Sequence, residues 1–278
     1  LFPRHPLGRE VLGTPGTVTS LSADDIRGFF DHHYRAGNLV VAAAGDVDHD
    51  ALAAEVEGRF AARPGGGAPA RLQPGDEVDA LVVTRRGTEQ VQLVLGARGP
   101  GRHEEARWAW AVLNHVLGGG MSSRLFQEVR ERRGLAYSVW SERTHYDEQG
   151  ALTVHVGTAP EHAHEVLGLI VDELERIGAS GVTERELAVA KGHLRAETLL
   201  SLEDSGARMS RIGSSLLLHG SVLTVDEVLA KVAGVGLGDV ADEARRLAAG
   251  ARVLSVVGPF DPADFDGAGV DWAAPSRR

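Results

Sequence analysis

The spacing of apolar residues along this 278-residue chain predicts an alternation of amphipathic helices and short buried strands. Near the beginning, Ser22 and Asp25 are spaced as a helix cap, and the apolar residues after them fall on one helical face. The uninterrupted apolar run 39–44 predicts a buried strand. Asp48 then predicts the start of a helix in which every fourth residue is apolar, ending at Phe60.

A second and longer part begins after a segment rich in glycine and proline. That segment, 63–79, contains Arg63-Pro64-Gly65-Gly66-Gly67 and predicts a linker. Directly after it, 80–86 and 90–95 are predicted to be two paired strands. The remaining pattern predicts helices at 104–117, 123–133, from 160, from 183 to 200, 203–218, 225–232 and 237–248, and strands at 135–144, 151–157 and 252–257.

The two parts close in similar ways. A helix that begins near Asp24 leads into the apolar run 39–46, and a helix that begins near Asp239 leads into the run 253–259. This similarity predicts one supersecondary unit used twice, with only its final part present in the first copy. The predicted organisation is a partial copy at 1–62, a linker at 63–79, a complete copy at 80–259 and a loosely held tail at 260–278.

Two further expectations follow from the first copy. If the copies are equal in length, on the order of 120 residues are missing before Leu1. The chain begins with Leu rather than Met, and its first residues do not have the architecture of a signal peptide. We therefore expect the chain to start within a longer protein.

Composition removes several classes of function. The net charge of −10, without a Lys/Arg cluster among aromatic residues, does not favour a nucleic-acid partner. No apolar run approaches membrane-spanning length, so a membrane partner is not expected. The absence of cysteine excludes disulfides, thiolate zinc sites and a cysteine nucleophile. The compartment is left open, with the cytoplasm slightly favoured.

The most distinctive stretch is 118–139. It reads as a glycine turn, a serine-capped amphipathic helix, a glycine stop at Gly134 and a strand. The glycines lack the Lys-Ser/Thr that follows a phosphate-binding loop. Within this stretch, Arg130 and Tyr137 are separated by a tight reversal and are predicted to meet at one edge of the sheet.

Arg130 and Tyr137 have two interpretations. A guanidinium and a phenol together are suited to bind a peptide carbonyl or the oxyanion derived from it. Alternatively, Arg130 is a solvated helix residue and Tyr137 a core residue, and strand alternation favours this because it places Tyr137 with Leu135 and Val139. The residues by themselves leave both interpretations open.

The stretch 118–139 resembles the C-terminal-domain signature of the insulinase/pitrilysin/processing-peptidase family of zinc metallopeptidases. The segment His5-Pro6-Leu7-Gly8 with Leu12-Gly13-Thr14, and the run 38–46, resemble the region that follows the zinc site in that family. The resemblance extends to about Pro259. It implies paired α+β domains, each with a mostly antiparallel sheet and helices packed on one face, enclosing a chamber for unfolded peptides.

The resemblance also implies roles for residues. In the family, zinc is held in the first domain by a His-x-x-Glu-His helix and a distal Glu, and the motif Glu is the general base. Arg130 and Tyr137 match the arginine and tyrosine that hold the substrate backbone beside the scissile bond. This chain has no His-x-x-Glu-His motif. The expectation is that it contains no catalytic metal site and no other cofactor, whereas the parent protein binds zinc.

Histidines elsewhere are weak candidates for zinc ligands. His145 with Glu148 lies at a hairpin turn, where helical ligand spacing has no meaning, and His162 with His164 lacks a third ligand at the required position. His115 and His193 lie on predicted helices and are interpreted as packed or half-exposed residues.

Three hypotheses result. The first is the C-terminal part of a zinc endopeptidase that contributes substrate binding and half of the chamber but is inactive alone. The second is a naturally metal-free partner subunit of a heterodimeric peptidase, and the third is a scaffold that does not handle peptides. The expected partners are a peptide substrate and the missing N-terminal half or a zinc-bearing subunit, in a homo- or heterodimer.

Overall fold

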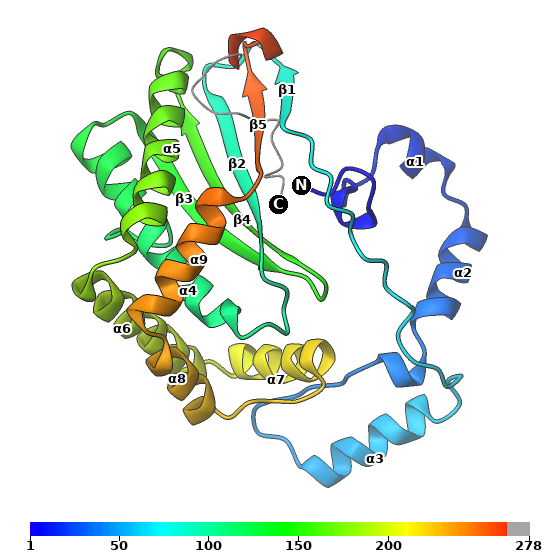
Figure 1. Ribbon diagram of the computed structural model, residues 1–278. Coiled ribbons are helices and arrows are strands. Elements are labelled where there is room, and N and C mark those ends of the chain that lie inside the picture. Colours follow the sequence, from blue (N-terminus) through cyan, green and yellow to red (C-terminus); the bar gives the residue numbers. More distant parts are fainter. Residues whose placement is uncertain (266–278) are drawn as a thin grey trace. The chain divides into compact units, whose positions relative to one another are not determined.

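The computed structural model describes residues 1–265, and the predicted tail at 260–278 therefore lies largely outside the described residues. The chain forms two compact units (Figure 1). Unit 1 contains residues 1–4, 74–195 and the part from Leu229, and unit 2 contains residues 5–73 and 196–228. The division into compact units does not test the predicted internal duplication, so the boundaries 1–62, 63–79 and 80–259 remain a prediction.

Unit 1 is built on a five-stranded sheet with the strand order β1-β5-β2-β4-β3. Three of its four strand pairs are antiparallel, and only β1 and β5 run parallel. The strands are β1 (Leu81–Arg85), β2 (Val91–Gly99), β3 (Ala136–His145), β4 (Gly150–Thr158) and β5 (Arg252–Gly258). The sheet is thus mixed, and each predicted strand of this part of the chain is present.

The prediction that the first two of these strands pair with each other is wrong. β5 lies between β1 and β2 and bonds to both, so that Leu254 is aligned with Leu81 on one side and with Leu95 on the other. The sequence suggested a hairpin because the two apolar runs are separated by a short polar segment. In the structure, β5 from the far end of the chain lies between the two strands, so each pairs with β5 and not with the other.

Helices cover one face of the sheet (Figure 1). The helices α4 (Ala106–Leu117), α5 (Ala163–Ser180) and α9 (Leu237–Ala249) pack on this face, where they contact β2, β3 and β4. The stripe predicted for α5 is confirmed, because its apolar residues are fully buried. Side chains of alternate strand residues complete this core: Val91, Leu93, Leu95, Val139, Leu152, Val154, Val156, Leu254 and Val256.

Unit 2 contains α1 (Pro15–Ser20), α2 (Ala23–His33), α3 (His49–Phe60) and α7 (Ser205–His219). The caps predicted at Ser22 and Asp48 are confirmed, since each side chain accepts a hydrogen bond from the backbone three residues on. Two helices continue from one unit into the other: α6 (Glu184–Leu200) and α8 (Val225–Gly234). Short helical turns are η1 (Pro6–Gly8), η2 (Ala36–Asn38), η3 (Phe126–Arg132), η4 (Pro160–His162), η5 (Ser201–Glu203) and η6 (Pro262–Phe265).

The prediction of a buried strand at 39–44 is wrong. The segment has no strand pairing among the described residues, and Val41 is half exposed. An apolar run forms a strand only when a neighbouring strand accepts and donates its backbone hydrogen bonds. In unit 2, the described residues offer no such strand.

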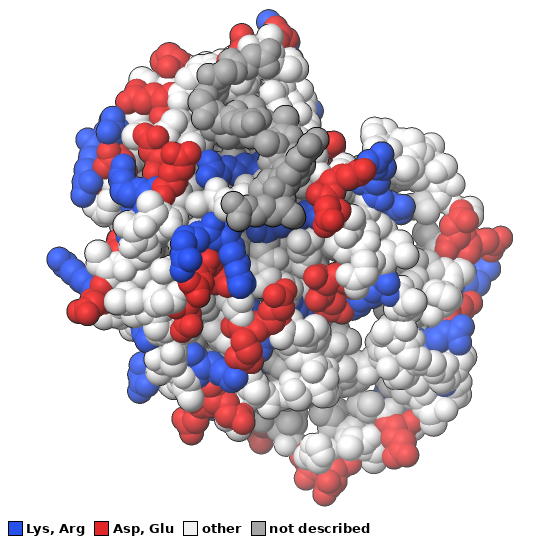
Figure 2. Space-filling view, in the orientation of Figure 1, with Lys and Arg blue, Asp and Glu red and all other residues white. Residues whose placement is uncertain are grey.

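Charged groups are mixed on the face displayed in Figure 2, where acidic and basic side chains alternate in small clusters. None of the helices in residues 1–265 is both long and apolar enough to cross a membrane.

Candidate functional site

The glycine turn that opens the segment 118–139 is fixed to the sheet. Gly118 ends α4, and its carbonyl accepts a hydrogen bond of 3.0 Å from the backbone N–H of Ser141 on β3. A Cβ atom on Gly118 would lie only 2.6 Å from that nitrogen, so a side chain is excluded here. The buried Ser141 hydroxyl donates to Asn114 Oδ1 at 2.8 Å. The turn is therefore held against the outer edge of β3.

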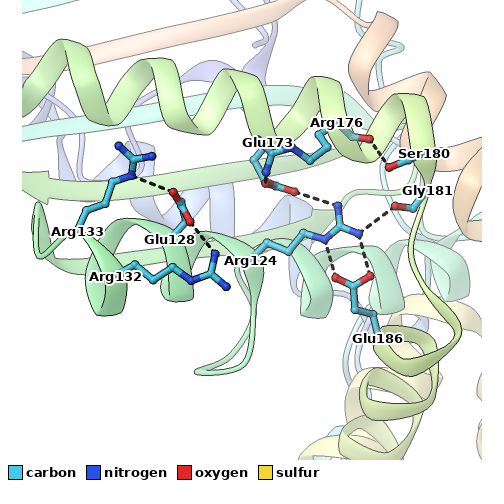
Figure 3. Close-up of polar contacts among 9 residues, drawn as sticks. All are labelled: Arg124, Glu128, Arg132, Arg133, Glu173, Arg176, Ser180, Gly181 and Glu186. Atoms are coloured by element: carbon cyan, nitrogen blue, oxygen red, sulfur yellow. Dashed lines mark hydrogen bonds and ion pairs between the residues drawn. The ribbon is translucent and has the colours of Figure 1, made fainter.

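The next anchor is Arg124, which is shown in Figure 3. Its guanidinium donates two hydrogen bonds, of 2.7 and 2.8 Å, to the carboxylate of Glu186 on α6. It also donates to Glu173 on α5 at 2.9 Å and to the carbonyl of Gly181 at 3.0 Å. The hydrogen bonds from Arg124 and Thr183 lower the pKa of Glu186 to about 2. This cluster ties the segment to two helices, and sequence reasoning did not identify it.

The helix predicted at 123–133 is present but wider than an α-helix over most of its length. Residues 126–132 form the π-helix η3, a rare geometry that is frequent at functional sites. Leu125 and Val129 are fully buried, which agrees with the predicted amphipathic helix, and Phe126 is only half buried. Gly134 has a φ of +64°, which confirms the predicted left-handed stop.

Tyr137 does not lie in the core, so the alternation argument that placed it with Leu135 and Val139 is wrong. Its side chain is 80% exposed, whereas Val139 is buried. The cause is a β-bulge: Ala136 is aligned with Thr158 and Ser138 with the adjacent Gly157, which leaves Tyr137 as an extra residue. A bulge re-aims a side chain and breaks the two-residue period of the strand.

The bulge brings Tyr137 to Arg130, as the sequence predicted. The Arg130 guanidinium carbon lies 4.5 Å from the centroid of the Tyr137 ring and 4.8 Å from that of Phe126. Such distances allow cation–π attraction, which orients the guanidinium without using its N–H groups. The sequence predicted Phe126 only as part of the buried face of the helix and not as a partner of Arg130, although its position four residues before Arg130 is a signal for such contact.

Arg130 has little internal neutralisation. Its side chain is 34% exposed, and the nearest carboxylate oxygen, on Glu131, lies 3.6 Å from its Nε atom. Within residues 1–265, no hydrogen bond from the Arg130 guanidinium is found, in contrast to Arg124. A guanidinium and a phenol that both face solvent form a donor pair for an external carbonyl oxygen.

The other candidate residues are not brought together into a metal site. His145 Nδ1 donates a hydrogen bond of 3.1 Å to the Pro100 carbonyl, and burial lowers the pKa of His145. The ring of His164 lies 5.0 Å from that of Phe265, and the rings of His115 and His193 stack at 4.2 Å. Among the described residues, no three His, Asp or Glu side chains gather closely enough to hold a metal ion.

Comparison with known families identifies the chain. The family described as the peptidase M16 inactive domain matches residues 20–194. The chain belongs to this peptidase M16 family. The resemblance drawn from the sequence is thereby confirmed, and the M16 domain here is of the C-terminal, inactive type.

Relatives of this M16 chain are named as zinc proteases. It is 43% identical over 268 residues to an uncharacterized zinc protease of Streptomyces coelicolor, a match that covers 94% of this chain and 58% of the relative. It is 41% identical over 264 residues to an uncharacterized zinc protease of Mycobacterium tuberculosis, covering 93% of this chain and 60% of the relative. The chain thus spans about 60% of the length of these relatives.

Solved structures share the fold. A peptidase M16 inactive domain from Pseudomonas fluorescens superposes with a TM-score of 0.84 at 24% identity, covering 94% of this chain and 63% of that one. A chain of complex III2 from Candida albicans superposes with a TM-score of 0.79 at 22% identity, covering 94% of this chain and 66% of that one.

The residues of this M16 chain do not fit the zinc that its relatives' names imply. The sequence lacks a His-x-x-Glu-His helix, and His115, His145 and His164 make packing or backbone contacts at separate places. No catalytic step through a metal is therefore derived for this chain.

Proposed function

We propose that this chain binds the backbone of unfolded peptide substrates for an M16 zinc endopeptidase, with Arg130 and Tyr137 as the binding residues. The observation that supports this is the pairing of an exposed phenol with a guanidinium that makes no hydrogen bond within the described residues. Both groups can donate to one carbonyl oxygen, and both can stabilise the oxyanion formed from it.

The chain alone is proposed to be catalytically inactive. Peptide hydrolysis by a zinc peptidase requires a metal-bound water and a general base. The family to which the chain belongs is described as an inactive domain, and the sequence contains no zinc-binding motif of the M16 type. In the whole protein, the metal-bearing part would supply both groups, and this chain would contribute part of the chamber wall.

Unit 2 supports the presence of a further M16 domain or subunit. Ile26 and Phe29 on α2 are 60% and 59% exposed, and the apolar run 39–44 has no strand partner among the described residues. Apolar surface of this kind marks an interaction site. We propose that a zinc-bearing domain or subunit covers it, and that residues 1–62 are a partial copy of the domain formed by residues 80–259.

A metal-free partner subunit remains the second candidate. It is favoured by the likeness of the fold to a chain of complex III2, a multi-subunit assembly. Both candidates require peptide binding at Arg130 and Tyr137, whereas the third, a scaffold, does not.

The test combines a binding assay and a cleavage assay. A labelled unstructured peptide is titrated with the wild-type chain and with the double variant Arg130→Gln/Tyr137→Phe, and cleavage is followed with and without a chelator. We expect binding that is lost in the double variant, and no cleavage by the chain alone. Binding by neither protein would favour the scaffold, equal binding by both would contradict the role of Arg130 and Tyr137, and chelator-sensitive cleavage would contradict the proposed inactivity.

A further inference from the structure

A second group of side chains lies on the open face of the sheet, beyond Tyr137 along β3. Trp140 and Glu142 belong to β3, and His155 belongs to the neighbouring strand β4, directly opposite Trp140. The Trp140 and His155 rings are parallel within 4°, with their centroids 5.0 Å apart. His155 Nε2 lies 3.3 Å from Glu142 Oε1 and 2.9 Å from Thr153 Oγ1. These contacts hold the indole ring and the carboxylate side by side.

This group and Tyr137 face away from the helix-covered core. Trp140 is 42% exposed and the Glu142 side chain 57% exposed, whereas Val139 and Ser141, the residues on either side of Trp140, are buried. Without the bulge, the odd-numbered Tyr137 would share the core face with Val139. The bulge therefore places Tyr137, which contacts Arg130 of η3, on the same side of β3 as the Trp140 group.

Their separation is short enough for one extended peptide to reach both. Tyr137 and Trp140 are three residue steps apart on the strand, which corresponds to ~10 Å at most. In an extended peptide, side chains on one face recur at about 6.6–7 Å. A peptide whose backbone is held at Arg130 and Tyr137 thus presents a side chain within reach of the Trp140 group about two or four residues away.

We propose that Trp140 and Glu142 form a specificity subsite for a cationic side chain, lysine or arginine, of the bound peptide. This inference rests on the proposed peptide-binding function of Arg130 and Tyr137. The indole is the best aromatic partner for a cation, and the Glu142 carboxylate supplies the complementary charge. An acidic side chain would be repelled by Glu142. An apolar side chain would make no ion pair with the carboxylate, so Trp140 and Glu142 together select for positive charge.

His155 is a positioning residue in this subsite. It stacks on Trp140 and contacts Glu142, and it thereby restricts the rotation of both side chains. A preordered subsite loses less conformational freedom when a ligand binds. The structural alternative, that these residues only cover the sheet, would give no dependence of binding on peptide charge.

The experiment uses peptides that differ in charge alone. A set of labelled unstructured peptides carries a single arginine at successive positions, and each has a counterpart with citrulline, which has the same shape without the charge. Affinities are measured by fluorescence anisotropy for the wild-type chain, Glu142→Gln and Trp140→Phe, with Arg130→Gln/Tyr137→Phe as the test of the backbone site. Asp172→Asn on α5, which covers the opposite face of the sheet, removes the same charge elsewhere.

For the wild type we expect the arginine peptide to bind ~5-fold more tightly than its citrulline counterpart at one or two positions. The preference should be lost in Glu142→Gln, reduced in Trp140→Phe and retained in Asp172→Asn, and it should weaken with added salt. Equal binding of both peptides, still dependent on Arg130 and Tyr137, would overturn the subsite and leave the proposed function standing. Binding that is absent, or independent of Arg130 and Tyr137, would overturn both.

Discussion

Arg124 and Arg130 lie close together on one helical segment, yet they are placed in opposite environments. The Arg124 side chain is 17% exposed, and its hydrogen bonds go to two carboxylates and a carbonyl within the chain. The Arg130 side chain is 34% exposed and lies over two aromatic rings. Both arginines stand in the same distinctive stretch, and nothing in their residue type distinguishes them.

The difference shows which of the two arginines remains able to bind a ligand. A guanidinium most of whose donors are used inside the protein stabilises the fold, because it neutralises carboxylates that are buried or partly buried. A guanidinium that is oriented by aromatic faces keeps its donors for an external acceptor. In this chain the first arginine fixes the segment to α5 and α6, and the second is presented to solvent beside Tyr137.

The largest expected effect comes from removing Arg124. Arg124→Met leaves the buried Glu173 carboxylate with Arg176 as its remaining partner and removes both guanidinium hydrogen bonds of Glu186, so we expect the free energy of unfolding to fall by about 3 kcal/mol. Urea denaturation followed by circular dichroism measures this. The matched control is Arg132→Met, whose exposed pair with Glu128 should contribute less than about 1 kcal/mol. Equal losses in the two variants would contradict the comparison.

Arg130 should give the reverse result. In Arg130→Gln the charged donor is lost, and we expect affinity for an unstructured peptide to fall by about 2 kcal/mol, or roughly 30-fold. The free energy of unfolding should change by less than about 0.5 kcal/mol, because the side chain neutralises no buried group. Peptide titration and urea denaturation of the same protein test both parts. A large loss of stability would show that Arg130, like Arg124, stabilises the fold, and would contradict the comparison.

The Glu186 carboxylate predicts a pH dependence of stability. Its pKa is about 2 in the folded chain and 4.5 in the unfolded chain, so folding favours the ionised form. Its contribution is fully present above about pH 4.5 and is lost as the pH falls towards 2. With allowance for solvent screening we expect about 1–2 kcal/mol.

The measurement compares unfolding free energies at about pH 6 and about pH 3 for the wild type and Arg124→Met. Other carboxylates, such as Glu128, also have lowered pKa values and affect both proteins alike. The wild type should lose more stability than the variant on acidification. Identical losses would show that Arg124 is not the source of the lowered pKa.

The smallest expected effect is that of Tyr137→Phe. The aromatic ring beside Arg130 is retained and only the phenol donor is removed, so we expect peptide affinity to fall by about 1 kcal/mol. Tyr137→Leu, which also removes the cation–π contact, should cost about 0.5–1 kcal/mol more. If Tyr137→Phe binds as tightly as the wild type, the hydroxyl takes no part and only the ring contributes.

Most elements of the chain could be predicted from the sequence, because they depend on local signals. The caps at Ser22 and Asp48, the stop at Gly134 and the stripe of α5 follow from residue spacing that acts within a few residues. The M16 resemblance and the meeting of Arg130 with Tyr137 also came from the sequence. Each of these depends on residues that are near one another in the chain.

What the sequence missed depends on distant partners. β1 pairs with β5, and Arg124 is anchored by Glu173 and Glu186, so both features join residues far apart in the chain. The run 39–44 forms no strand because the described residues of unit 2 offer it no partner strand. The exposure of Tyr137 was missed because a bulge, set by pairing with β4, broke the period on which the alternation argument relied.

The sequence by itself determined the helices, their caps, the family and the two residues of the candidate site. Only the tertiary structure decided which strand lies between which, which arginine is neutralised and which face Tyr137 occupies. The physical reason is that apolar periodicity and capping are satisfied within one element, whereas strand order, charge neutralisation and register depend on groups that only folding brings together.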